Sequence, residues 1–515
     1  MVVKSKLELR EETAGIRYWM ERALVELDKA QQDLAPDPVH DLRVALRRCR
    51  SMAEGFQTID PDPTWRRMRK ACKAIFAPLG ELRDTQVMIE WVTKLGKHGD
   101  TATESLLRLF EDRERQQKIQ LTGILPGFDR KQWRQWAEFL SSRANQIPRP
   151  SPVFEYLALE RWENAHELHR TALRNRSQTA YHQLRIGLKK LRYVTENFLP
   201  EHHQRWGKDL KELQDALGEV HDLDVLWGAA VASGFLAAAE VRAQWRTRIV
   251  EERELRIDAY RRKMVGKASL WPVWRAELPA GDMLQKAILE RFRILVHLMN
   301  AEPDHVQRVT GLTLQLYDQL CLAGFLVRDG GLLRVLVEAA SLLHAIGRTK
   351  RNKDYHKISA RMIGRMNPPI GWRASDLQIA ALIARYHRGS LPSPRQNRFG
   401  QLSPEQQKLT EELAGVLRLT ETLDRTHQGG IRKIAVERTP ETLVLHVEGY
   451  DAENRAGEEI AAARYLLERT VGLPIVITSN QRSAQKSGAQ SLKPFTQEQP
   501  AMAHRAFPST EDFPG

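Results

Sequence analysis

A histidine followed by regularly spaced arginines and lysines occurs twice in the chain. The first copy spans residues 40–50 and the second residues 182–192, 142 positions later. Both carry cations three, seven, eight and ten positions after the histidine. At 100° per residue, the histidine and the cations at three, seven and ten positions fall within about 80° of a helix surface. Each segment therefore predicts a helix with a stack of cations on one face, suited to a long and negatively charged ligand.

A separate apolar stripe accompanies each cationic face. It consists of Leu42, Leu46 and Cys49 in the first copy and Leu184, Leu188 and Leu191 in the second, and Phe56 and Phe198 extend it. The stripe is about 60° wide, so each helix is expected to bury one side and present its cations on another.

The duplication continues beyond these helices, at an offset of 138. Residues 79–87 match residues 217–225, and three cations repeat before them: Arg67, Lys70 and Lys73 in the first half, Arg205, Lys208 and Lys211 in the second. Cations on a single helix are usually a solvated face. Here each half has two cationic helix faces at matching positions. Repulsion among these charges would destabilise the fold unless an anion neutralises them.

These motifs resemble the CHAD family, the histidine-containing α-helical domain. The resemblance rests on His-x-x-Arg-x-x-x-Arg-Arg-x-Arg followed by Leu-Gly-x-x-Arg/His-Asp-x-x-Val, present in both halves over residues 5–265. It implies helical halves, 5–145 and 153–265, related by a pseudo-twofold axis around a basic channel for inorganic polyphosphate. The implied lining residues are His40, Arg43, Arg47, Arg48, Arg50, Arg67, Lys70, Lys73, His182, Arg185, Lys189, Lys190, Arg192, Arg205, Lys208 and Lys211.

Two His-Asp dipeptides, at 40–41 and 221–222, carry the signature of metal-dependent HD hydrolases. The repeat argues against a metal, because Gln183 replaces the aspartate of the first dipeptide and Arg83 the histidine of the second. A position for a cation explains the exchange of histidine and arginine better. Asp84 and Asp222 match each other and are expected to orient an arginine or to cap a helix.

The C-terminal region resembles a different family. Residues 342–348 are similar to the Leu-Leu-His-Asp-Ile-Gly-Lys core of the HD superfamily, with Ala345 in place of the aspartate. Together with His305 and segments 355–357, 384–388 and 417–425, they resemble the C-terminal domain of exopolyphosphatases and guanosine pentaphosphate phosphohydrolases over residues 283–478. In that family hydrolysis belongs to an N-terminal actin-like domain, whose glycine-rich phosphate loops do not occur here.

The metal site implied by the HD resemblance is degenerate. His305 and His344 remain, and Glu421 stands where the later aspartate would be, but Ala345 offers no oxygen ligand. We therefore expect neither metal nor cofactor, and no hydrolysis. A second anion site could form from His356, Lys357, Arg385, His387 and Arg388, although such histidines are often packing groups.

Composition limits the partners. The net charge is +14, which favours anionic partners, but few aromatic residues are interleaved with the cations, so nucleic acid is not expected. Three cysteines without metal or disulfide spacing, no signal core and no run of about 18 apolar residues favour a cytoplasmic protein without membrane contact. An association with polyphosphate granules would be consistent with this location.

The predicted fold is mainly α: a duplicated helical bundle, a linker at 266–282, an HD-like helical domain with a small terminal β element, and a disordered tail at 479–515. The predicted function is binding of inorganic polyphosphate, with the second domain as a non-catalytic module for phosphate or a phosphorylated nucleotide. The alternative is a metal-dependent HD-type phosphohydrolase acting on polyphosphate or a phosphorylated nucleotide.

Overall fold

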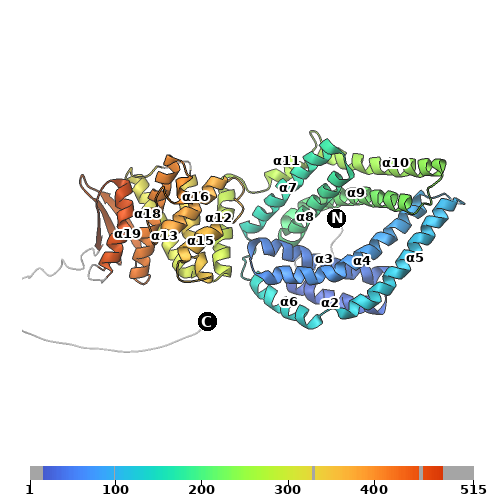
Figure 1. Cartoon of the computed structure of the whole chain (residues 1–515), viewed down its shortest axis with the longest axis horizontal. Coiled ribbons are helices and arrows are strands. Elements are labelled where there is room, and N and C mark those ends of the chain that lie inside the picture. The colour runs from blue at the N-terminus through green and yellow to red at the C-terminus, as the bar shows by residue number, and fades with distance from the viewer. Residues whose placement is uncertain (1–14, 98, 328–330, 452–455, 480–515) are drawn as a thin grey trace, which may run out of the picture.

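The computed structural model describes residues 15–97, 99–327, 331–451 and 456–479. The predicted mainly α fold is confirmed, with a single small sheet near the C-terminus of the described chain (Figure 1). The tail expected to be disordered lies, apart from Ser479, outside the described residues. None of the helices in the described ranges is long and apolar enough to cross a membrane.

The first domain contains two sets of helices in the same order. The first half consists of α2 (Ile16–Gln32), α3 (Pro36–Ile59), α4 (Pro63–Leu95), α5 (Thr101–Ile124), the single turn η1 (Leu125–Gly127) and α6 (Arg130–Ala144). The second half consists of α7 (Pro152–Asn175), α8 (Gln178–Phe198), α9 (Pro200–Ala232) and α10 (Ala239–Met264). The two cationic segments lie in α3 and α8, as predicted, and the second cation triplets lie in α4 and α9, which have 33 residues each.

Local sequence explains where these helices begin. Asp62 caps α4 by accepting a hydrogen bond from the Thr64 amide, and Ser177 caps α8 by accepting one from the Ala180 amide. Proline occupies the first turn of α3, α4, α7 and α9, where its missing N–H removes no intrahelical bond.

The two halves meet first where α3 packs on α8. Phe56 and Phe198, the equivalent ends of the two apolar stripes, touch with ring centroids 5.1 Å apart, and Phe154 stacks on Phe198 at 4.6 Å. A side chain at Gly55 would bring its Cβ within 2.4 Å of the Phe198 ring, so this contact depends on glycine. The ends of the duplicated stripes therefore meet between the halves.

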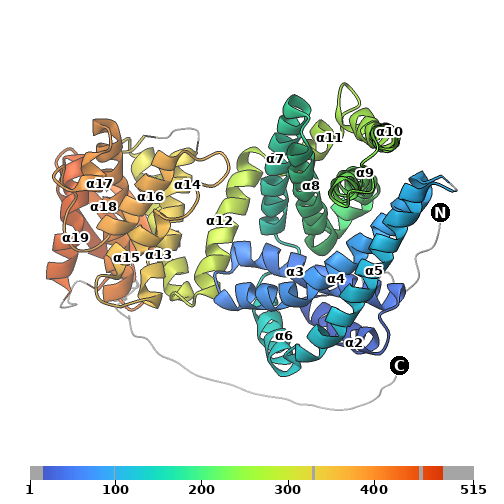
Figure 2. The same ribbon diagram turned by 45° about the vertical axis from the view of Figure 1, so that its right-hand side comes forward.

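A second contact closes the far end of the domain. There the C-terminal parts of α4 and α9 join α5 and α10 in a separate apolar cluster that includes Val92, Leu106, Leu226 and Trp245. Lys94 of α4 pairs with Glu252 of α10 at 3.2 Å across this contact. Between the two contacts the paired helices diverge as two arms, α4 with α5 and α9 with α10 (Figures 1 and 2).

The segment expected to be a linker is packed rather than extended. It contains α11 (Leu270–Ala276), whose Trp271 and Trp274 are buried. Trp274 lies 5.9 Å from the Trp206 ring of α9, and Trp271 lies 5.4 Å from the His169 ring of α7. Residues 270–276 therefore complete the core of the first domain.

The second domain is a helical bundle. Its helices are α12 (Gly281–Leu298), α13 (Pro303–Leu322), α14 (Leu332–Leu343), α15 (Tyr355–Ile363), α16 (Ala374–Tyr386), α17 (Asn397–Gly400) and α18 (Pro404–Thr426), with the turn η2 (Ile346–Thr349). Strands β1 (Lys433–Arg438) and β2 (Leu443–Glu448) pair antiparallel, and β3 (Ile475–Ser479) adds parallel to β2 after α19 (Gly457–Val471). This sheet is the predicted terminal β element.

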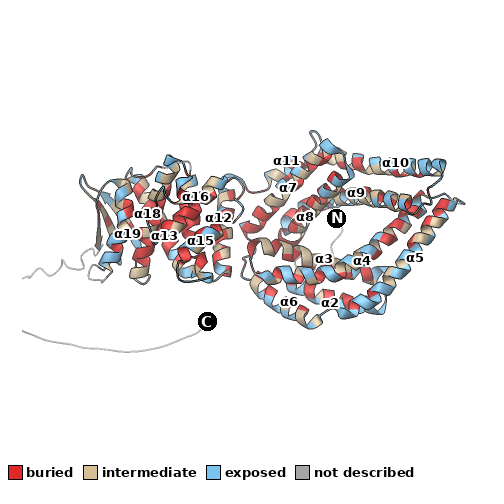
Figure 3. Ribbon diagram, viewed as in Figure 1, coloured by how far each residue is buried: buried red, intermediate tan, exposed pale blue. Residues whose placement is uncertain are grey.

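Helix α12 joins the two domains by packing on α7 and α3. Arg291 of α12 donates to the Thr58 carbonyl at 3.1 Å and pairs with Glu160 at 3.4 Å, while the Ile370 amide donates to the Tyr156 hydroxyl at 3.1 Å. One apolar core runs through both domains, and Figure 3 shows buried residues continuing from the bundle into α12.

Candidate functional site

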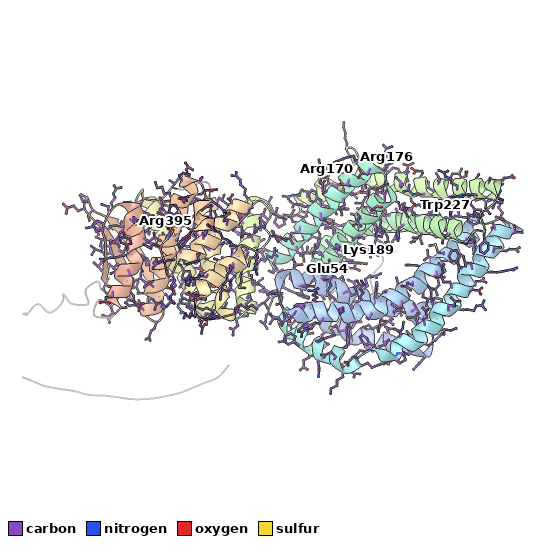
Figure 4. The ribbon with its side chains drawn as sticks, in the orientation of Figure 1. Glu54, Arg170, Arg176, Lys189, Trp227 and Arg395 are labelled. Atoms are coloured by element: carbon purple, nitrogen blue, oxygen red, sulfur yellow. The ribbon has the colours of Figure 1, made fainter. Side chains whose placement is uncertain are left out.

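Four cations from the two halves converge where α3 crosses α8. Arg43 and Arg47 belong to α3, and Arg185 and Lys189 to α8; we call them the central cation cluster. Lys189 lies within electrostatic reach of all three arginines, and burial together with their charges lowers its pKa to about 8. Figure 4 shows Lys189 beside the interface of the two halves, at the base of the space between the arms. The predicted meeting of the two cationic helices is therefore present in the fold.

An arginine of this cluster lies beside an equivalent glycine in each half. A Cβ on Gly80 of α4 would lie 3.2 Å from Nη1 of Arg43, and a Cβ on Gly218 of α9 would lie 3.9 Å from Nε of Arg185. Those same two nitrogens are buried and have no hydrogen-bond partner among the described residues. Gly80 thus lets the Arg43 guanidinium lie close against α4, whereas the distance at Gly218 is an ordinary contact that a Cβ would not disturb. Both arginines keep donor capacity that the protein does not use.

A carboxylate from each long helix lies near these cations. Asp84 offsets part of the lowering of the Lys189 pKa, and burial raises the pKa of Asp222 to about 6 despite the nearby Arg185. Neither residue caps a helix, contrary to one of the expected roles, because both lie in helix interiors. Two carboxylates cannot balance four cations, so the site keeps an excess of positive charge.

Two histidines beside the cluster do not add to this charge. His182 and His221 face each other with their Nδ1 atoms 3.2 Å apart. Burial and the neighbouring Arg185 lower both pKa values, that of His221 to about 4. The interpretation of position 221 as a cation is therefore wrong near neutral pH; this position provides a neutral hydrogen-bonding group.

Arg48 and Lys190 do not line a free basic surface, contrary to expectation. Arg48 pairs with Glu196 at 2.6 Å, and both side chains are nearly inaccessible, at 12% and 9% exposure. Lys190 pairs with Glu54 at 3.2 Å. Because these four residues are equivalent under the repeat, they form two reciprocal ion pairs that hold α3 and α8 together across the pseudo-twofold axis.

The remaining predicted residues lie around the cluster at varying distance. Arg50 lies over the Phe76 ring at 4.6 Å, and Arg192 donates to Gln214 at 3.1 Å. Arg205 pairs with Glu277 at 2.7 Å, so it faces α11 and not the opposite half. Five lysines and arginines and one histidine are exposed, and no ion pair holds them within the described ranges: His40, Arg67, Lys70, Lys73, Lys208 and Lys211.

The degenerate HD positions also come together, in the second domain. His305 of α13 lies 5.8 Å, ring to ring, from His344 at the end of α14. His344 donates from Nδ1 to the Ser341 carbonyl at 2.6 Å, and its burial lowers its pKa to about 3. Nε2 of each histidine is buried without a partner in the described structure.

The carboxylates of this site are engaged by neighbouring side chains. Asp424, rather than Glu421, contacts His305, with Oδ2 2.7 Å from Nδ1. Glu421 accepts a hydrogen bond from the Tyr355 hydroxyl at 3.4 Å and lies 3.7 Å from Arg425. The residues present do not fit an HD metal, and no three His, Cys, Asp or Glu side chains in the described part of the chain are arranged to hold one.

The second anion site expected from the sequence is divided in the structure. His387 is buried and lies 3.0 Å from the Tyr355 hydroxyl, and burial lowers the pKa of both His387 and His356, the latter to about 4. These histidines are neutral packing groups. Lys357 and Arg385 instead line a cavity that neither histidine lines.

Comparison with protein families identifies two domains in the chain. Residues 10–231 match the CHAD domain, and residues 293–455 match Ppx/GppA phosphatase, domain III. The chain joins these two domains. A search of curated proteins gives no match. The central cation cluster and the cross-half ion pairs fall within the CHAD match, and His305, His344, His356 and His387 fall within the domain III match.

Sequence reasoning missed several residues that shape both sites. In the CHAD domain, Glu54 and Glu196 recur fourteen positions after the repeated histidines, so the repeat itself carried the signal for the cross-half pairs. In domain III, Asp424 lies one helical turn beyond Glu421 on the same helix, a spacing that leaves the choice of carboxylate to the packing of α13. Tyr355 carried no signal beyond its place next to His356.

Substitution of the neighbouring residues Arg47 and Arg48 should have different effects on the free energy of unfolding. Arg48→Gln should lower the free energy of unfolding by about 3 kcal/mol, because it leaves the buried Glu196 only the more distant Arg192, at 4.0 Å, as a partner. Arg47→Gln should leave it within about 0.5 kcal/mol of the parent or raise it, because it relieves repulsion within the cluster. Denaturant unfolding of both variants measures the difference. A larger loss for Arg47→Gln than for Arg48→Gln would contradict the assignment.

Proposed function

We propose that the CHAD domain binds inorganic polyphosphate at the central cation cluster, with the exposed cations of α4 and α9 extending the site along the arms. The observation that carries this proposal is the convergence of Lys189 with Arg185 of its own half and Arg43 and Arg47 of the other. Cations held close together repel one another, so the cluster favours a ligand with closely spaced negative charges. Buried guanidinium donors without partners favour phosphate oxygens, which accept charge-assisted hydrogen bonds.

Polyphosphate fits better than single-stranded nucleic acid. Sequence-tolerant binding of nucleic acid uses aromatic rings as stacking platforms for bases. The rings nearest the cluster already lie against arginines: Phe76 is 5.2 Å from the guanidinium of Arg43, and Tyr193 is 6.0 Å from that of Arg47. A polymer without bases needs only the cations.

Charge reversal in either half should weaken polyphosphate binding. Arg47→Glu and Lys189→Glu are each expected to lower the affinity for long-chain polyphosphate at least about tenfold, because each removes a cation and places a carboxylate in the cluster. The parent affinity should fall by orders of magnitude between about 50 and 200 mM salt, since bound phosphates release counterions. Fluorescence titration across that salt range measures both effects.

The matched control is Lys486→Glu, the same charge change in the tail outside the described residues. It should leave affinity unchanged. If only one of the two cluster variants lost binding, the shared site would be contradicted. If single-stranded RNA at equal phosphate concentration bound as tightly over the whole salt range, the choice of polyphosphate would be wrong.

Binding should also depend on pH through Lys189. Its pKa of about 8 in the free protein should rise toward the ordinary value of 10.5 beside a bound polyanion, which favours the charged form. The complex therefore gains a proton above pH 8, and affinity should fall about tenfold as the pH rises from 7 to 9. Lys189→Arg should retain binding and lose this dependence. An unchanged pH profile in Lys189→Arg would assign the titration to another group.

For domain III we propose a non-catalytic role in binding phosphate or a phosphorylated nucleotide. Position 345 carries no carboxylate. Glu421 is engaged by Tyr355 and Arg425, and Asp424 by His305 and Arg308. These residues therefore leave no ligand set for a divalent cation that would activate water.

The three cysteines are free thiols, which suits the reducing cytoplasm where the protein would meet polyphosphate.

The non-catalytic role predicts no release of phosphate from polyphosphate, nucleoside triphosphates or guanosine pentaphosphate when Mg²⁺, Mn²⁺ or Co²⁺ is added. A colorimetric phosphate assay on the full chain is the measurement. Turnover that disappears in His344→Ala would instead support the HD-type phosphohydrolase. The same variant should leave polyphosphate binding by the CHAD domain unchanged, which separates the two functions.

A further inference from the structure

Domain III contains a cavity of about 710 Å³ bounded by α15, α16 and α17. We call it the α15–α16 cavity. Neither His356 nor His387 lines it, and its size is within the range of pockets that enclose small organic ligands. Its lining has two chemically different parts.

One part is cationic. Lys357, Arg361, Arg385 and Arg398 line the cavity, and no aspartate or glutamate does. Asp354 pairs with Lys357 at 2.9 Å, but for the three arginines the described residues provide no ion pair. Nη1 of Arg385 is buried without a hydrogen-bond partner, and burial lowers the pKa of this guanidinium. Three unpaired guanidinium groups around one cavity favour a ligand with more than one phosphate.

The other part is apolar and is bounded by amides. Leu377, Ala381 and Leu382 of α16 form a buried apolar wall, while the side chains of Asn397 and Gln401 reach the cavity from α17 and the residue after it. An apolar wall contributes nothing to the binding of an inorganic anion. It suits the face of a planar ring, whose polar edge could bond with the amide groups.

We propose that the α15–α16 cavity binds a nucleotide carrying two or three phosphates. The base lies against the α16 wall, and the phosphates contact Arg385 and Arg398. This inference deepens the proposed phosphate-binding role of domain III and rests on it, but it is independent of polyphosphate binding by the CHAD domain. It replaces the site expected at His356 and His387, which are neutral and buried.

Calorimetric titration of the full chain with ATP, GTP, inorganic tripolyphosphate and adenosine tests the proposal. A purine triphosphate should bind at least about tenfold more tightly than tripolyphosphate, and adenosine should bind weakly. Arg385→Gln and Arg398→Gln should each weaken nucleotide binding at least about tenfold. Ala374→Trp, an exposed position on the cavity lining, should block the cavity without changing its charge.

The matched control is Arg395→Gln, which changes an exposed arginine on the same segment that does not line the cavity; it is labelled in Figure 4. It should leave nucleotide affinity unchanged. Tripolyphosphate binding as tight as that of either nucleotide in the Arg47→Glu variant, whose CHAD site is weakened, would overturn the proposal, as would nucleotide binding lost in Arg47→Glu but retained in Arg385→Gln. If the parent chain bound nucleotide but not polyphosphate, only the function proposed for the CHAD domain would be overturned.

Discussion

The packing of α3 on α8 is the constraint on which the first domain depends. The two helices are equivalent copies, so the apolar ends that pair them, Phe56 and Phe198, also bring their equivalent cations together. Like charges are then forced into one site, and the reciprocal pairs Arg48–Glu196 and Lys190–Glu54 offset part of the repulsion at its edge. The charge left unpaired in the middle is a consequence of the symmetry and the basis of the proposed binding.

The cations of each repeated motif therefore divide into two classes. Arg47 and Lys189, seven positions after each histidine, form no ion pair within the described structure. Arg48 and Lys190, one position later, pair with a glutamate of the other half. Adjacent residues on one helix differ by about 100° in direction, so consecutive cations can serve binding and assembly separately. Exchanging Lys189 for arginine is not conservative, because burial and the neighbouring arginines lower the pKa of the Lys189 ammonium to about 8.

The meeting of the two cationic faces was expected from the duplication and from the resemblance to the CHAD family. Sequence periodicity predicted the helices and their apolar stripes, because both follow from the spacing of residues along a single helix. It could not predict partners. Arg205 was expected on the lining, but Glu277, seventy-two positions later, turns it toward α11. His221 was interpreted as a cation, but its burial depends on the packing of α8 and α9. The α15–α16 cavity was missed for the same reason: its lining comes from three separate helices, none of which is distinctive alone.

The far contact between the arms has a consequence for the order in which the chain folds during synthesis. Trp91, Val92 and Leu95 leave the ribosome well before Leu226 and Trp245, the residues of the second half that cover them. Until about 150 further residues have been made, the tip of the first arm can bury its apolar side chains only against α5. The nascent first half is thus a separate folding unit with an exposed hydrophobic end, the kind of surface that chaperones bind and that promotes aggregation when synthesis stalls.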